Sequence, residues 1–182
     1  NSPGRVAIDG SGNLILADRY NFKIRKITPT GVVRTIAGST QGFADGTGSA
    51  AKFSQPLDVA LDPSGNIIVA DNTNHRIRKV TPAGVVTTVA GNGTPGYLNG
   101  TGTAAEFYYP SGVAVDGSGN IYVADRFNQR IRKITSAGAV TSYAGTGVSG
   151  NLDGTASSAK FSDPYDVEVD GSGNLFVADL LN

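Results

Sequence analysis

The chain has 182 residues, of which 39% are hydrophobic and 16% are charged, and its fifteen basic residues balance fifteen acidic ones. This composition excludes a chain kept disordered by its charge, and a net charge of zero argues against a strongly electrostatic nucleic-acid binder. Cysteine is absent and histidine occurs once, which excludes disulfides, thiol catalysis and any site built from several histidines. No apolar run approaches the roughly 20 residues of a membrane-spanning helix.

A segment of about 36 residues recurs along the chain. The copy at 56–91 returns at 110–145, an upstream copy covers 3–38, and a fourth begins at residue 164. The four copies start at proline, at intervals of 53, 54 and 54 residues. Because this period is nearly constant, the chain is predicted to be a tandem array of one structural unit.

Each copy predicts four short strands. In the second copy they cover residues 59–61, 66–70, 76–80 and 85–90, where Val, Ile and Thr are common or basic residues alternate with apolar ones. The first two strands are separated by Asp-x-Ser-Gly-Asn and the last two by Thr-Pro-x-Gly. Aspartate at the start of a turn and glycine at a positive φ are typical of hairpins. Four antiparallel strands in a unit of roughly 40 to 55 residues indicate a β-propeller blade.

The motif Ala-Asp-x-x-Asn-x-x-Ile-Arg-Lys, preceded by Gly-Asn-x-x-Val or Gly-Asn-x-x-Leu, closely resembles the NHL repeat. The second copy carries Asn74 and His75 in the family's order, with Arg76 where leucine is usual. The resemblance covers essentially the whole chain and implies an all-β β-propeller of four-stranded antiparallel NHL blades. The blades are predicted at residues 3–55, 56–109 and 110–163, with a half blade at 164–182.

About 3.5 blades are fewer than the roughly four to eight that close a propeller. The resemblance implies six repeats as the ordinary number. The chain also contains no methionine and begins at Asn1. We therefore expect a fragment or partial ring of a longer propeller, or chains that associate through their open blade faces.

Strand order predicts which face of the propeller carries function. The hairpins between the first and second strands and between the third and fourth strands are nearly the same in every copy, so they are expected to be structural. The turns between the second and third strands (the B–C turns) and the connectors between blades vary and carry aromatic and polar residues, which favours a binding surface. The predicted ligand-binding residues are Arg19, Tyr20, Asn72, His75, Tyr97, Tyr109, Arg126 and Phe127.

Three motifs suggest other chemistry, and each has a simpler interpretation. Glycine strings at 91–96 and 145–150 match G-x-G-x-x-G but lack the following helix of a dinucleotide site, so we interpret them as loops. The Asp-x-Ser-Gly-Asn turns offer one carboxylate each, too few for calcium. His75 lacks an identifiable nucleophile or orienting partner, so it is predicted to be an exposed turn residue rather than a catalytic base.

Nine of the fifteen positive charges lie on the predicted third strands. Some NHL propellers bind RNA, so the resemblance raises that alternative. We favour hydrogen bonds to the repeated aspartates, as exposed pairs that each contribute little, over contacts with nucleic acid. The nine residues are Lys23, Arg25, Lys26, Arg76, Arg78, Lys79, Arg130, Arg132 and Lys133.

Three carboxylates break the repeat where the innermost strand should line a central channel. Asp58 and Asp166 stand where other copies have Arg5 and Gly112, and Glu168 replaces an alanine. Calcium-dependent lactonase-like propellers, which are similar in architecture, hold a cation with such groups. We favour ordinary variation at a solvated channel mouth and keep a metal-dependent hydrolase as the alternative.

The sequence therefore predicts a non-catalytic binding scaffold, with no cofactor or metal, whose ligand is a protein or a glycan. We expect no nucleic-acid partner and no membrane insertion, and self-association through open blade faces is a further expectation. A subunit of a larger or filamentous extracellular assembly is a second alternative. The connector pattern Gly-Thr-x-x-Ala-Ala-x-Phe resembles secreted bacterial NHL proteins, which favours an extracellular or cell-surface location.

Overall fold

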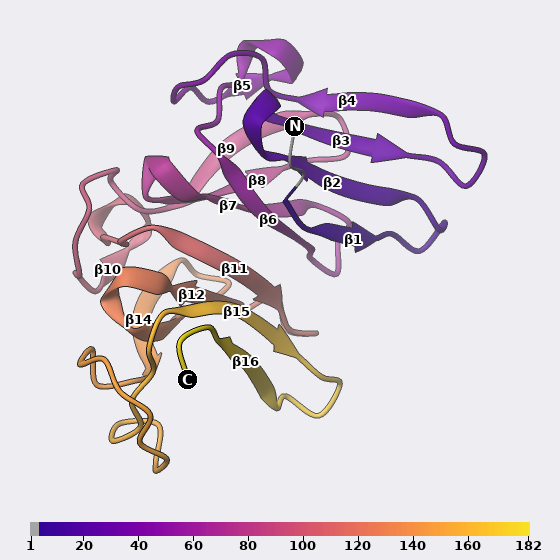
Figure 1. The fold of residues 1–182 in the computed structure, drawn as a ribbon. Coiled ribbons are helices and arrows are strands. Elements are labelled where there is room, and N and C mark those ends of the chain that lie inside the picture. Colours follow the sequence, from indigo (N-terminus) through magenta and orange to yellow (C-terminus); the bar gives the residue numbers. More distant parts are fainter. Residues whose placement is uncertain (1–3) are drawn as a thin grey trace.

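The computed structural model describes residues 4–182, so the predicted start of the first blade at Pro3 lies outside the described residues. The strands form antiparallel sheets that follow one another in chain order, from indigo to yellow in Figure 1. The first sheet contains β1 (Val6–Ile8), β2 (Leu14–Asp18), β3 (Lys23–Ile27) and β4 (Val33–Ala37). The second contains β6 (Pro56–Leu61), β7 (Ile67–Asp71), β8 (Arg76–Val80) and β9 (Val85–Ala90). The third contains β11 (Pro110–Val115), β12 (Ile121–Asp125), β13 (Arg130–Ile134) and β14 (Ala139–Ala144), and the last pair is β15 (Pro164–Val169) with β16 (Leu175–Asp179).

The expected all-β propeller architecture is confirmed. The first strands β1, β6, β11 and β15 are neighbours in that order, so the sheets are arranged as consecutive blades around them (Figure 1). The sheets do not close into a ring within residues 4–182.

Two blades contain a fifth strand that the sequence does not predict. The connectors contribute β5 (Gly46–Thr47) and β10 (Gly100–Thr101), which pair with the outer strands β9 and β14 of the following blades. The pairing is continued by the backbone of Gly48, whose N–H donates to the carbonyl of Gly84. Each of these connectors is thereby attached along the edge of the next blade rather than looping freely over it.

Local chemistry explains the repeated hairpins. The Asp62 Oδ1 atom accepts hydrogen bonds from the N–H groups of Ser64 and Asn66, at 2.9 and 2.8 Å, while Gly65 adopts φ of +78°. The same arrangement recurs in the other copies. These turns hold the first two strands in register and leave the opposite ends of the strands to form the variable face.

The core lies between consecutive blades. Side chains such as Val69 and Ile77 are fully buried, and each core cluster joins residues of one blade to residues of the next. The connector residues Phe53 and Phe107 are also fully buried in these clusters. Packing between blades therefore fixes the positions of the connectors that carry Phe53 and Phe107.

Candidate functional site

The B–C turns share one backbone design. Each is a single 3₁₀ turn, at Arg19–Asn21 (η1), Asn72–Asn74 (η3) and Arg126–Asn128 (η5), followed by a left-handed residue. The third residue is asparagine because its side chain anchors the turn: Asn74 donates to Asp71 and to the Gly42 carbonyl, both at 2.8 Å. The second residue of η1 and of η5, Tyr20 or Phe127, is exposed on the variable face, whereas Asn72 at the start of η3 is buried.

The first residue of each turn reaches across to the following blade. Arg19 donates to the side-chain oxygen of Gln55 at 2.7 and 3.0 Å, and Asn72 donates to the Pro110 carbonyl at 2.9 Å. Arg126 forms a two-point ion pair with Asp163, which raises the pKa of the guanidinium. These predicted ligand-binding residues therefore already have partners in the chain, and they join neighbouring blades.

Four aromatic rings meet at the seam between the second and third blades, and we call His75, Tyr108, Tyr109 and Phe127 the aromatic patch. The Tyr109 ring centroid lies 4.6 Å from that of His75 and 5.1 Å from that of Phe127. Tyr108 lies 5.3 Å from Phe127 in an edge-to-face arrangement, which is a favourable geometry for aromatic pairs. Phe127 is 44% exposed and Tyr108 is 36% exposed, so the patch is a preformed surface with two accessible rings.

Three members of the aromatic patch are among the predicted ligand-binding residues, and the fourth, Tyr108, belongs to the aromatic connectors of the same predicted face. The available signal was the pair of adjacent tyrosines at 108–109, where the other copies have Ser54-Gln55 and Ser162-Asp163. Tyr20 is 44% exposed at the preceding seam, where the guanidinium of Arg19 lies 4.9 Å from the centre of its ring.

Tyr97 does not join the aromatic patch. Its hydroxyl lies 2.9 Å from the hydroxyl of Ser142, and its ring packs under the guanidinium groups of Arg130 and Arg132, at 4.4 and 4.7 Å. Tyr97 thus covers β13 and β14 of the third blade, because the connector that carries it runs along that blade's outer strands.

The prediction that His75 is an exposed turn residue is wrong. Its side chain is only 7% exposed, and its Nδ1 atom accepts a hydrogen bond from the backbone N–H of Tyr109 at 3.1 Å. Burial, assisted by the nearby charge of Arg76, lowers the pKa of His75. The imidazole therefore acts as a neutral acceptor that joins two blades beneath the aromatic patch.

The chain itself offers a non-titrating substitute for His75. At the next seam Gln129 occupies the same position, and its side-chain oxygen accepts from the Asp163 N–H at 2.7 Å. The folded protein holds His75 neutral, whereas in the unfolded chain a histidine has a pKa of about 6.5 and takes up a proton below that pH. The contribution of neutral His75 to stability is therefore complete above about pH 6.5 and is lost as the pH falls below it. We expect His75→Gln to keep the acceptor and to remove this loss.

Urea unfolding of both proteins between pH 7.5 and 5 checks this expectation. The variant is expected to lose less stability on acidification, by at most about 1.4 kcal/mol per pH unit, the limit for one proton. The effect of other titrating groups is common to both proteins and cancels in the comparison. Equal pH dependence would show that His75 does not titrate as its contacts imply.

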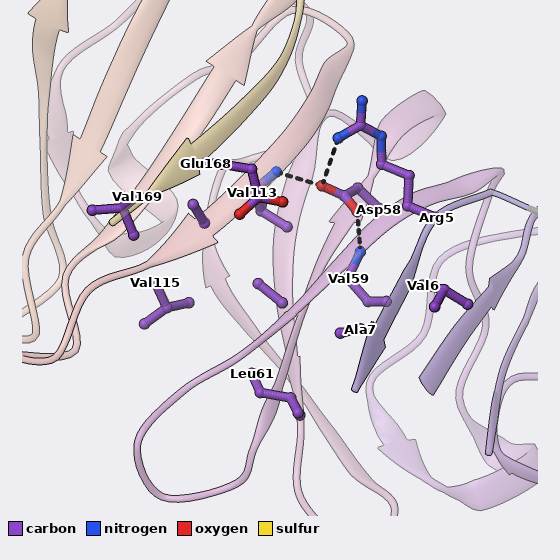
Figure 2. A pocket seen from close by; sticks show the side chains of 12 residues that line it. Arg5, Val6, Ala7, Asp58, Val59, Leu61, Val113, Val115, Glu168 and Val169 are labelled. Carbon is purple, nitrogen blue, oxygen red and sulfur yellow. Dashed lines mark hydrogen bonds and ion pairs between the residues drawn. The ribbon is translucent and has the colours of Figure 1, made fainter. Parts of the chain in front are cut away.

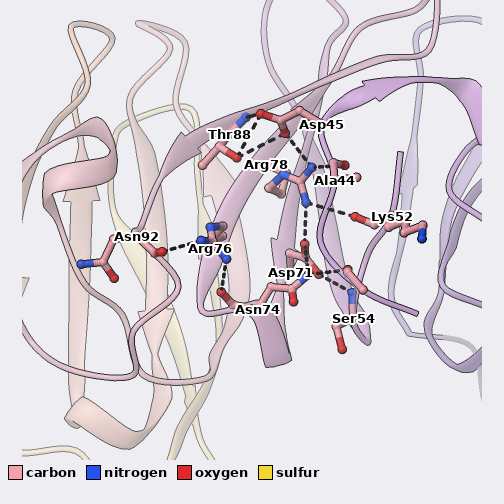
Figure 3. A network of polar contacts seen from close by, with 11 residues as sticks. Ala44, Asp45, Lys52, Ser54, Asp71, Asn74, Arg76, Arg78, Thr88 and Asn92 are labelled. Atoms are coloured by element: carbon pink, nitrogen blue, oxygen red, sulfur yellow. Dashed lines mark hydrogen bonds and ion pairs between the residues drawn. The ribbon is translucent and has the colours of Figure 1, made fainter. Parts of the chain in front are cut away.

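The predicted exposed Asp–Arg pairs are wrong for the second and third blades. Arg78 and Asp71 are both fully buried and 2.8 Å apart, and Arg78 also donates to the Ala44 carbonyl at 2.8 Å and to Asp45 at 2.7 Å (Figure 3). Arg132 makes the same buried pair with Asp125, at 2.7 Å. The central arginine of the third strand is buried because the preceding connector folds over it, so it holds connector and blade together.

The aspartates that begin the Asp-x-Ser-Gly-Asn hairpins (Asp9, Asp62, Asp116 and Asp170) do not pair with arginine. Asp62, for example, accepts a hydrogen bond from the side-chain amide of Asn66 at 2.8 Å and so stabilises its own hairpin. In the first blade, the equivalent residue Asp9 also accepts from Lys26 at 2.9 Å. The aspartates of the hairpins thus stabilise turns, whereas Asp71 and Asp125 pair with the buried arginines.

Two of the three channel carboxylates, Asp58 and Asp166, are not the free solvated groups that the sequence suggested, whereas Glu168 is exposed. Asp58 is 4% exposed and accepts from the N–H groups of Val59 and Val113, each at 2.8 Å (Figure 2). Burial raises its pKa to about 6. Arg5 lies 4.0 Å from Asp58 and also forms an ion pair with Asp166. One guanidinium therefore bridges the two carboxylates that a calcium-dependent site would need.

A cavity of about 440 Å³ lies beside this ion pair, between the innermost strands (Figure 2). Its walls are valine, alanine and leucine side chains, and Glu168 adds a carboxylate from β15. Within residues 4–182 no three Asp, Glu or His side chains converge in a way that could hold a metal ion. The cavity can accept a small molecule, but the Asp58 carboxylate on its wall is already bound by the N–H groups of Val59 and Val113 and lies beside Arg5.

Comparison with known proteins identifies the repeat. The family model described as NHL repeat matches residues 53–80 and 107–134. NHL repeat-containing protein 2 of Gallus gallus is 42% identical over 98 residues, which cover 52% of this chain and 13% of that protein.

Two solved structures extend the comparison to the fold. A Bacteroides thetaiotaomicron protein of unknown function superposes with a TM-score of 0.81 at 27% identity, over 97% of this chain and 44% of its own. A putative gluconolactonase superposes with a TM-score of 0.66 at 17% identity, over 97% of this chain and 57% of its own, which shows a shared fold. The chain thus spans about an eighth of the Gallus gallus relative and about half of these structures. Among residues 4–182 no helix is long and apolar enough to cross a membrane. Repeats, fold and family match together establish that the chain is an NHL-repeat β-propeller protein.

Proposed function

We propose that the chain is a non-catalytic binding module that takes a protein or glycan on the face formed by its B–C turns and connectors. The aromatic patch carries this proposal, because it presents the accessible rings of Tyr108 and Phe127 on a surface held by the surrounding blades. Tyrosine and arginine are enriched among residues that contribute most to binding, and rigid rings lose little conformational entropy when a ligand binds.

Arg126 supports the same surface. Its guanidinium lies 5.1 Å from the ring centre of Phe127 and 5.2 Å from that of Tyr165, and its ion pair with Asp163 fixes its position. The aromatic patch therefore has an ordered guanidinium group on the side where the third blade meets β15. A ligand with an apolar or planar group and a nearby hydrogen-bond acceptor suits this arrangement.

A hydrolase in the central channel is the weaker candidate. The gluconolactonase-like neighbour supports it through fold alone, and Arg5 already occupies the space between Asp58 and Asp166. We therefore propose binding rather than catalysis. An extracellular or cell-surface location belongs to the same proposal and rests on the connector pattern at 46–53 and 100–107.

Ligand selection followed by mapping tests this proposal. The purified chain would be screened against a glycan array and a displayed peptide library, and amide hydrogen exchange would then be measured with each selected ligand. We expect protection at residues 19–22, 72–75, 108–109 and 126–129. Protection confined to the hairpins at 9–13, 62–66 and 116–120, on the opposite face, would contradict it. Protection confined to the inner strands would instead favour the channel.

A further inference from the structure

A groove lies at the seam between the second and third blades, at the hairpin ends of the strands and thus on the face opposite to the B–C turns. Its volume is about 380 Å³, within the range that holds small ligands. Its floor is apolar, because Ile68 and Ile121 are only 2% and 6% exposed and Val89 packs beside them. Hairpin residues and the side chain of Lys79 form the polar rim. The groove, which we call the hairpin groove, therefore joins an apolar floor to a cationic group.

Smaller residues on the facing blade open this groove at the second seam. Gly117 of the third blade stands where the second blade presents Pro63 to the first, and a β-carbon at Gly117 would meet no atom within 4 Å. Ser136 likewise stands where the second blade has Pro82. The hairpin groove is therefore a property of this seam, although the hairpins themselves are nearly the same in every copy.

Lys79 differs from the equivalent lysines of the other two complete blades. Lys26 forms an ion pair with Asp9 at 2.9 Å, and the ammonium group of Lys133 lies 5.4 Å from the centre of the Tyr122 ring. Among the residues that the structure describes, Lys79 makes neither contact and has no other hydrogen bond or ion pair. Because Lys79 is half-buried beside an apolar floor, an anionic group in the groove would gain a charged hydrogen-bond donor.

The nearby aspartate of the second blade is already bound within its own hairpin. Asp62 lines the groove, but its Oδ1 atom accepts from the backbone N–H groups of Ser64 and Asn66. Its Oδ2 atom accepts from the side-chain amide of Asn66 at 2.8 Å. The position of this carboxylate favours a ligand whose single anionic group is directed toward Lys79 and away from the hairpin.

The third blade shows which chemical group fills the equivalent space. Tyr122 and Tyr143 stand where the second blade has Ile68 and Val89. The two tyrosine rings lie 5.2 Å apart in an edge-to-face arrangement, and Lys133 lies over the Tyr122 ring. The second blade keeps the lysine but has neither ring. A planar ring supplied by a ligand therefore suits the space between the apolar floor and the lysine.

We propose that the hairpin groove binds a small aromatic carboxylate, with its ring on the floor formed by Ile68, Val89 and Ile121 and its carboxylate beside Lys79. The ring takes the place that tyrosine occupies in the third blade, and the carboxylate supplies the anionic partner that Lys26 has in the first. This site is separate from the aromatic patch, and the inference does not depend on the proposed ligand face.

Binding of 3-phenylpropionate to the complete 182-residue chain tests the proposal. Titration followed by two-dimensional NMR is expected to give saturable shifts of the amide signals at 62–64, 117–119 and 135–138. The expected dissociation constant is roughly millimolar, as is usual for a ligand of this size. The matched alcohol 3-phenyl-1-propanol keeps the ring and the chain length but lacks the charge. It should bind at least about fivefold more weakly.

Three variants locate the binding groups. Lys79→Met should weaken binding of 3-phenylpropionate about fivefold or more, because the carboxylate loses its cation. Lys26→Met removes the equivalent lysine at the first seam and should leave the affinity unchanged. Val89→Tyr copies Tyr143 of the third blade, so its ring should fill the groove and remove saturable binding. Unchanged thermal unfolding would show that the variants fold.

Several results would overturn the proposal. They are an absence of saturable shifts with 3-phenylpropionate, equal binding of the acid and the alcohol, full affinity in Lys79→Met, and equal losses in Lys79→Met and Lys26→Met. Shifts confined to residues 72–75, 108–109 and 126–129 would also overturn it, because the ligand ring would then occupy the aromatic patch.

Discussion

Replacing Arg78 by leucine is expected to destabilise the fold by about 3–5 kcal/mol, because the change leaves the carboxylate of Asp71 buried without its cation. Both side chains are fully buried, and the guanidinium also satisfies the carbonyls of Ala44 and Lys52. Urea unfolding followed by far-ultraviolet circular dichroism measures the loss. We expect a lower midpoint without a change in the unfolding mechanism.

The first blade supplies the matched control for this substitution. Arg25 makes the equivalent pair with Asp18 at 3.1 Å, but its side chain is 35% exposed. Arg25→Leu should therefore cost clearly less than Arg78→Leu, although it also leaves a largely buried carboxylate, that of Asp18, without its cation. Equal losses for Arg78→Leu and Arg25→Leu would mean that burial under the connector does not determine the importance of this arginine.

Truncating Phe107 to alanine should destabilise the fold by about 3–5 kcal/mol, the range for removing a buried aromatic side chain. The ring is fully buried between the second and third blades, against Ile77 and Ile134, and it faces the guanidinium of Arg132. No rearrangement of one blade alone can fill the space, because residues from both blades surround it. Thermal and urea unfolding would report the change.

Phe161 provides the comparison for Phe107. It occupies the same repeat position, but its ring is only half-buried because no arginine lies over it within the described residues. Phe161→Ala is expected to cost no more than about half as much as Phe107→Ala, since less buried area is lost. A larger loss at Phe161 would place the main stabilising contacts at the open end of the array rather than between complete blades.

Much of the fold can be predicted from the sequence because its determinants are local. The Asp-x-Ser-Gly-Asn turns specify hairpins through contacts within four residues, as Asp62 and Asn66 illustrate. Segments in which basic and apolar residues alternate, or in which β-branched residues are common, then form the strands of the blades. The fifth strands are different: β5 and β10 contain Gly-Thr alone, and their pairing is determined by where the connector meets the next blade.

The parts of the site that could not be predicted depend on contacts between distant residues. Alternating basic residues on a strand suggest exposed charges, yet Arg78 is buried by a partner 33 positions away, Asp45. The bridge from Arg5 to Asp166 joins the first blade to the last. The variable B–C turns lie on the same side of the molecule as the aromatic patch, but which rings meet depends on how the second and third blades pack.

If the aromatic patch is the binding surface, one pair of substitutions should distinguish it from an equally exposed ring elsewhere. Phe127 and Tyr143 are 44% and 41% exposed, and Tyr143 lies outside the patch, packed on Tyr122. Affinity for a ligand selected from the peptide library or glycan array would be measured for Phe127→Ala and Tyr143→Ala. We expect at least a tenfold loss for Phe127→Ala and an unchanged affinity for Tyr143→Ala. Unchanged binding by Phe127→Ala, or a loss confined to Tyr143→Ala, would contradict it.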